Sequence, residues 1–165
     1  MLIWLILICA AVLLQTTVFS WLKLWGVKPD LVLIVVLYAA FWKGSRRGAI
    51  VGFAGGIVED IASGGLLGAN AFAKLIAGFL FGISRRKFYV ESLRLQVIAA
   101  FLGTLLSQLI FFLLVQVCGE ERPLSSLKIL LPLACYNAML APLIFRCMRK
   151  IVKERYDRSK PDRGF

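Results

Sequence analysis

Residues 52–65 read Gly-Phe-Ala-Gly-Gly-Ile-Val-Glu-Asp-Ile-Ala-Ser-Gly-Gly and place two adjacent carboxylates, Glu59 and Asp60, in an otherwise apolar, glycine-rich segment. Gly52 and Gly56 are four residues apart, so they share one face of a helix. In lipid, such a face lets another helix backbone approach closely. Glu59 follows Gly52 by seven residues and Asp60 follows Gly56 by four, so both acids lie on or beside this face. We therefore expect them to contact protein rather than lipid.

The composition of the whole chain indicates a membrane protein. It has 165 residues, of which 60% are hydrophobic, and a mean hydropathy of +0.83. A soluble domain is about 45–50% apolar. The net charge of +11 would be compatible with nucleic-acid binding, but the basic residues fall between apolar runs and near the C-terminus. This distribution indicates a topology signal, with membrane lipids and no nucleic acid as partners.

The apolar runs predict an all-α membrane protein, a bundle of six transmembrane helices. A helix that crosses a bilayer needs about 20 residues, and the second and third runs are shorter. Flanking Lys and Arg side chains can reach the headgroups and offset this mismatch. We expect one domain, residues 1–152, followed by a basic cytoplasmic tail, residues 153–165. The predicted spans are residues 2–22, 29–43, 47–63, 66–83, 95–118 and 129–150.

The distribution of basic residues predicts the orientation of these spans. With the N-terminus inside, residues 43–47, 84–94 and the chain from Arg146 onward carry fifteen Lys and Arg residues. The segments outside carry four. Because basic residues are enriched in cytoplasmic segments, we expect both termini in the cytoplasm.

The fourth predicted helix offers partners for the two acids, because it carries Asn70 and Lys74. Side chains lean toward the N-terminus of their own helix, so Glu59 and Lys74 converge if the third and fourth helices are antiparallel. Asp60 is then closer to Asn70 or to the backbone N–H groups of residues 64–68. An alternative in which Asp60 pairs with Lys74 stays open. A proton or ion relay is the functional alternative, but the remaining polar residues form no ionisable ladder across the bilayer.

The sequence argues against catalysis and metal binding. It contains no histidine, and its four cysteines form no C-x-x-C pair. Adjacent acids on a helix point about 100° apart, which is unfavourable for a shared catalytic dyad. We expect no catalytic, cofactor-binding or metal site, and no enzymatic activity.

Several short motifs carry a resemblance to a known family. They are Gln15-Thr16-Thr17, Lys28-Pro29-Asp30, Gly-Phe-x-x-Gly-Ile-x-x-Asp at 52–60, Leu67-Gly68-Ala69-Asn70 and Tyr136-Asn137-Ala138. In their order and spacing the chain resembles the rod shape-determining protein MreD family over its whole length. The resemblance marks Gln15, Pro29, Asp30, Gly68 and Asn137 as family-motif residues. The chain departs from the family pattern at Glu59, where an uncharged residue is more usual.

The resemblance implies a non-enzymatic adaptor in the bacterial inner membrane. Proteins of this family associate with MreC and help couple MreB filaments to peptidoglycan synthesis by RodA and its transpeptidase partner. Their fold is similar to the six-helix substrate-binding S-components of energy-coupling-factor transporters. Such a vitamin transporter subunit is the alternative function. Against it, the first helix has only Ala10 and Ala11, which cannot form the Ala-x-x-x-Ala coupling motif of those subunits.

Overall fold

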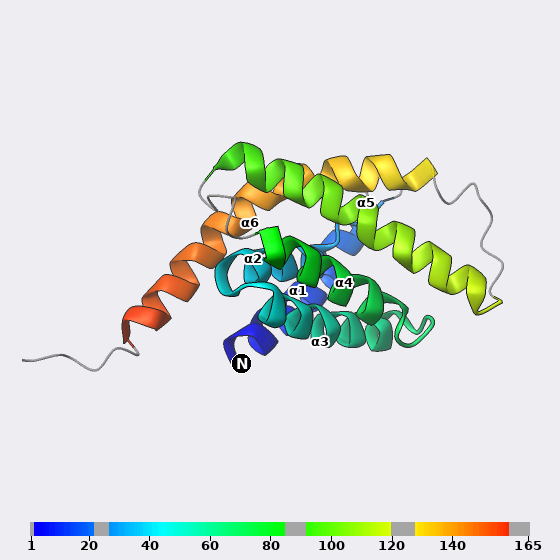
Figure 1. Ribbon diagram of the computed structural model, residues 1–165, viewed down its shortest axis with the longest axis horizontal. Coiled ribbons are helices and arrows are strands. Elements are labelled where there is room, and N and C mark those ends of the chain that lie inside the picture. The colour runs from blue at the N-terminus through cyan, green and yellow to red at the C-terminus, as the bar shows by residue number, and fades with distance from the viewer. Residues whose placement is uncertain (1, 22–26, 85–91, 120–127, 159–165) are drawn as a thin grey trace, which may run out of the picture.

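The computed structural model describes residues 2–21, 27–84, 92–119 and 128–158. Within these segments the regular structure is helical, which confirms the predicted all-α architecture (Figure 1). The six helices are α1 (Leu2–Trp21), α2 (Leu31–Lys43), α3 (Ser45–Ser63), α4 (Ala69–Ile83), α5 (Leu93–Val117) and α6 (Leu130–Arg158). In Figure 1, α5 and α6 lie along one side of the bundle, and α1 and α3 lie along the other.

Two helices begin later than the apolar pattern indicated. The sequence places Pro29 in the first turn of the second helix, but in the structure Asp30 is the N-cap and the helix begins at Leu31. The cap forms because the Asp30 side chain accepts the Leu33 N–H. The fourth helix begins at Ala69 rather than residue 66, because Gly68 takes a positive φ of 100°.

The last helix is longer than expected. The sequence ends its span at residue 150 and assigns residues 153–165 to a tail, whereas α6 continues to Arg158. Residues 153–158 contain Lys, Glu and Arg, which favour helix, and basic residues are stabilising near a helix C-terminus. The first six residues of the expected tail therefore extend α6.

Helix α2 is the centre of the bundle and packs against each of the other five helices. All eleven residues from Leu31 to Phe41 are buried. A helix that is apolar on every side has to be enclosed, and this one is enclosed by protein. Its 13 residues span only about 20 Å at 1.5 Å per residue. Protein therefore surrounds this short helix on every side.

Helices α3 and α4 form the closest pair in the bundle, and glycines line their contact. A Cβ atom added to Gly52 would overlap the backbone carbonyl of Lys74, and one added to Gly56 would overlap the backbone of Ala71. Nearer the other end of the pair, Gly48 and Gly78 face each other with the same lack of space. The predicted glycine face is therefore an internal packing surface.

A tight connection joins α3 to α4. Gly64 ends α3 in the left-handed conformation, with φ of 64°, and donates its N–H to the Asp60 carbonyl. This conformation disfavours residues with a Cβ. The connection turns the chain back on itself, so the C-terminal end of α3 and the N-terminal end of α4 lie side by side (Figure 1).

Two of the described helical segments are long and apolar enough to cross a membrane, Leu93–Val117 and Leu130–Val152. The apolar segments Leu2–Thr17, Leu31–Lys43 and Ala69–Ile83 are shorter. Large apolar side chains are also exposed on the outside of the bundle, among them Leu13, Leu109 and Met139. Extensive exposed apolar surface marks contact with lipid or with other proteins.

The Gly52 contact yields a stability prediction. We expect Gly52→Ala to lower the free energy of unfolding by about 1–3 kcal/mol, the usual cost of overpacking a rigid contact. The cost arises because the obstructing atoms belong to the Lys74 backbone and not to a flexible side chain. Thermal unfolding of the purified protein in detergent measures this loss. Gly65→Ala is the matched control, because a Cβ there meets only the Ser63 hydroxyl, at 3.6 Å. Equal midpoints for the two variants would contradict the assigned contact.

Candidate functional site: a buried polar network

The Lys74 side chain is the centre of a buried polar network. It is fully buried, and its Nζ lies 2.6 Å from Glu59 Oε2 and 2.8 Å from Asp30 Oδ2. The Asn70 side-chain oxygen is 3.4 Å from the same nitrogen. An ammonium group has three protons to donate, and these three oxygens come from three different helical elements. The sequence analysis predicted the ion pair of Lys74 with Glu59, and the structure adds a second ion pair with Asp30.

The glycine contact brings the two charges on α3 and α4 together. Gly52 lies directly against the Lys74 backbone, and Glu59 is two helical turns farther along α3 on the same face. Lys74 leans toward the start of α4 and Glu59 toward the start of α3, so the side chains meet between the helices. The alternative pairing of Lys74 with Asp60 is not observed.

Asp30 connects the ion pairs to the rest of the bundle. One oxygen of its carboxylate binds Lys74, and the other accepts the Leu33 N–H at 2.8 Å, which caps α2. Its backbone N–H donates to Asn137 Oδ1 on α6 at 2.9 Å. Asn137 in turn donates from Nδ2 to the Thr104 hydroxyl on α5 at 2.9 Å. Helices α2, α4, α5 and α6 are thus linked through consecutive polar contacts.

Gln15 adds α1 to the same network. Its side-chain Nε2 donates to Glu59 Oε1 at 2.8 Å, so the Glu59 carboxylate is held by α1 on one side and α4 on the other. With this contact, every one of the six described helices contributes to one continuous polar network. Glu59 is the member through which α1 and α3 join.

Asp60 has a separate role at the start of α4. It is 1% exposed, and its carboxylate accepts hydrogen bonds from the backbone N–H groups of Gly68, Asn70 and Ala71 and from the Asn70 side chain, at 2.8–3.3 Å. The N-cap residue of α4 is Gly68, which has no side chain for capping. Asp60 therefore supplies the capping carboxylate from the neighbouring helix, where a negative charge also interacts favourably with the helix dipole.

The network holds helices together, and its charged groups are engaged with each other or with backbone N–H groups. Lys74 is shared between two carboxylates, Asp60 is saturated by N–H donors, and the Thr104 hydroxyl donates to the Ala100 carbonyl of its own helix at 2.7 Å. Within the residues that the structure describes, no three His, Cys, Asp or Glu residues are grouped so that they could hold a metal ion. The arrangement suits a structural role.

The family model of the rod shape-determining protein MreD matches residues 1–155. The chain belongs to the MreD family. This membership confirms the resemblance inferred from the short motifs, and with it involvement in the determination of rod shape by a membrane-associated protein. No curated protein and no solved structure matches the chain. None of these comparisons relates it to a transporter subunit.

The MreD motifs, which are far apart in the sequence, meet in the structure. Gln15, Asp30 and Asn137 are all members of the polar network. Gly68 shapes the turn before α4 and donates its N–H to Asp60. Pro29 lies just before the Asp30 cap. The motif residues thus share one structural location, at the end of the bundle where α2 and α4 begin and α3 ends.

Sequence reasoning did not predict the contacts of two members of the network, Thr104 and Asp30. Thr104 lies in an apolar run of the sequence, and no spacing rule connects it to Asn137. Asp30 was marked as a family-motif residue at the start of a helix, but its ion pair with Lys74 was not predicted. A signal for its ion pair was available, since the second and fourth helices begin at the same end of an antiparallel bundle. Asp30 and Lys74 are therefore expected at similar depth.

The shared position of Lys74 yields a second prediction. Lys74→Met removes the only cation of the network and leaves two buried carboxylates facing each other. Breaking a buried ion pair costs about 3–5 kcal/mol, and we expect a loss of at least that size in detergent unfolding experiments. Glu59→Leu should cost less, because Asp30 still pairs with Lys74.

A double-mutant cycle isolates the contribution of one pair. Lys74→Met/Glu59→Leu should be more stable than the sum of the two single losses implies, because the double change leaves only Asp30 without its cation. In the double variant Asp30 keeps the hydrogen bond from the Leu33 N–H but has lost its ion pair. The double variant should therefore regain only part of the stability that Lys74→Met loses. Simple additivity of the two single changes would show that Glu59 and Lys74 do not interact.

Proposed function

We propose that this protein is a non-enzymatic adaptor of the bacterial elongation machinery in the inner membrane. In this role it binds MreC and helps couple cytoplasmic MreB filaments to peptidoglycan synthesis by RodA and its transpeptidase partner. The observation that carries the proposal is the match of the MreD family model to residues 1–155, which leaves little of the chain outside the family region.

The polar network supports an adaptor over an enzyme. An adaptor has to present a defined outer surface, and a network that joins all six described helices fixes their relative positions. An enzyme needs a nucleophile, a base and groups that stabilise developing charge within mutual reach of a substrate. The charged groups of this network are instead engaged with each other in the interior.

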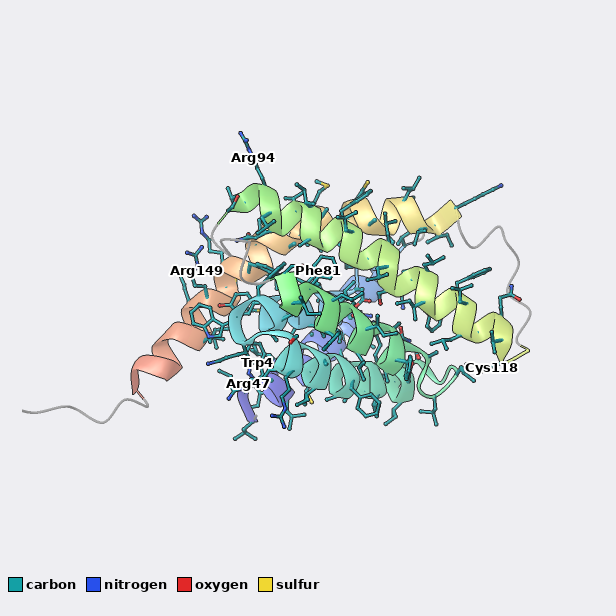
Figure 2. The ribbon with its side chains drawn as sticks, viewed as in Figure 1. Trp4, Arg47, Phe81, Arg94, Cys118 and Arg149 are labelled. Atoms are coloured by element: carbon teal, nitrogen blue, oxygen red, sulfur yellow. The ribbon has the colours of Figure 1, made fainter. Side chains whose placement is uncertain are left out.

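The proposal includes six membrane crossings with both termini in the cytoplasm. Fifteen of the twenty basic residues belong to segments on the inner side of this topology. The arrangement of the helices agrees with such a segregation, because Arg47, Arg94 and Arg149 lie at one end of the bundle and Cys118 at the other (Figure 2). The short length of α2 is accommodated because the other helices enclose it.

Cysteine labelling tests this topology. In a chain that retains Cys118 as its single cysteine, which is exposed, a membrane-impermeant maleimide should label intact spheroplasts. Chains with Ser45→Cys or Ser92→Cys as the single cysteine should be labelled only after the membrane is permeabilised. Labelling of Ser45→Cys from outside would contradict the assignment of α2 and α3 as two separate crossings.

Depletion and complementation test the function. In a rod-shaped host that depends on its MreD, depletion should produce round cells, and this protein should restore rods and co-purify with MreC. Lys74→Met should restore shape poorly, because the variant loses the contacts that hold α2, α3 and α4 together. Gly65→Ala, at an uncrowded position, should restore shape fully. Normal shape after depletion, combined with loss of vitamin uptake, would contradict the adaptor role and favour a transporter subunit.

A further inference from the structure

The end of the bundle opposite the polar network carries a cluster of exposed basic side chains. We call Arg46, Arg47, Arg94, Arg146 and Lys150 the basic rim; they lie at the start of α3, the start of α5 and on the last turns of the apolar part of α6. Arg47 and Arg94 project on opposite sides of this end (Figure 2). The rim residues are thus distributed over the starts of α3 and α5 and the last apolar turns of α6.

The described acids do not neutralise the rim. The acidic residues whose side chains the structure describes are Asp30, Glu59 and Asp60, and all three are engaged in the network or in the cap of α4. They lie at the opposite end, where α2 and α4 begin. Among the described residues the rim is therefore a cluster of positive charge without an acidic neighbour, and such a cluster attracts anions.

An exposed apolar stripe continues from the rim along each of the three helices. On α3, Arg46 is followed at helical spacing by the exposed Ile50 and Phe53. Arg94 on α5 is followed in the same way by Ile98 and Leu102.

On α6 the order is reversed, because this helix runs toward the rim. Arg146 is preceded at helical spacing by the exposed Leu143 and Met139. Each of the three helices therefore presents a basic group at its end and an apolar stripe below it on the same face.

We propose that the basic rim binds the phosphate groups of anionic phospholipids, with the acyl chains of these lipids on the adjoining apolar stripes. This inference rests on the proposed membrane insertion. The guanidinium group of arginine matches phosphate oxygens with two parallel hydrogen bonds. A soluble polyanion or an acidic protein segment would use the charges but leave the apolar stripes without a partner. A lipid with an anionic headgroup matches both parts of the surface.

Lipid selectivity in vesicles tests the proposal. The full chain is reconstituted in phosphatidylcholine vesicles, and spin-labelled phosphatidylglycerol and spin-labelled phosphatidylcholine are compared by the fraction that the protein immobilises. We expect phosphatidylglycerol to be preferred. Each basic residue near a membrane surface contributes about fivefold to binding of anionic lipid. Arg46→Gln/Arg47→Gln should therefore reduce the preference by several-fold, and added salt should weaken it in the unmodified protein.

Two further variants distinguish the rim from net charge alone. Lys28→Gln/Lys128→Gln removes the same number of charges from exposed residues at the other end, where buried carboxylates outnumber Lys74, and should change the preference much less. Arg94→Gln alone should give an intermediate loss and provides a second test if the double arginine variant does not fold.

Equal losses from the two double variants would overturn the proposal, because the selectivity would then follow net charge. Equal binding of both lipids to the unmodified protein would also overturn it and would leave an acidic protein segment as the partner of the rim. Failure of the protein to insert into vesicles would refute the proposed membrane insertion, and this inference with it. Phosphatidylglycerol selectivity that is lost only in the rim variants supports the proposal.

Discussion

The arrangement of the helices depends on the ion pairs that the buried Lys74 ammonium group forms. It is fully buried and pairs with carboxylates from two other helical elements, Asp30 and Glu59. A buried cation is costly unless its partners are close and correctly oriented. Any shift of α2 or α3 relative to α4 would separate one of these pairs. The energetic penalty of an unpaired charge in a low dielectric therefore fixes the relative positions of three helices, and hydrogen bonds extend the constraint to the others.

The backbone permits this arrangement only because side chains are missing at particular positions. Gly52 lies against the Lys74 backbone and Gly56 against the Ala71 backbone. A larger residue at either site would move α4 outward, and the Lys74 side chain would move with it. The glycines and the charged residues thus act together. The glycines let α3 and α4 approach closely enough for Glu59 to reach Lys74, and the ion pairs hold the helices at that distance. In a membrane, burial of apolar surface drives helix association only weakly, and close backbone packing and polar contacts between helices are the main contributions.

Local patterns predicted those features that depend on a single helix or on one adjacent pair. Long apolar runs indicated the helices, and four-residue glycine spacing indicated the face on which α3 meets α4. The tilt of side chains in an antiparallel pair brought Glu59 toward Lys74.

Local patterns could not predict the features that depend on the packing of three or more helices. An apolar run such as Leu31–Phe41 reads the same whether lipid or protein surrounds it, so the central position of α2 was not predictable. The contacts of Asp30 with Asn137, and of Asn137 with Thr104, require the packing of helices that are distant in sequence.

The order of the network residues along the chain has a consequence for biosynthesis. A ribosome delivers Asp30 and Glu59 before Lys74, so in the proposed membrane setting the nascent protein passes through a stage with two carboxylates and no cation. At that stage an ionised carboxylate in contact with lipid has a large free-energy penalty. The tight glycine contact and the short connection between α3 and α4 resolve this conflict if the two helices leave the translocon together as a preformed hairpin. In that setting we expect α3 and α4 to insert together, so that Lys74 enters the membrane with Glu59, its partner on the adjacent helix.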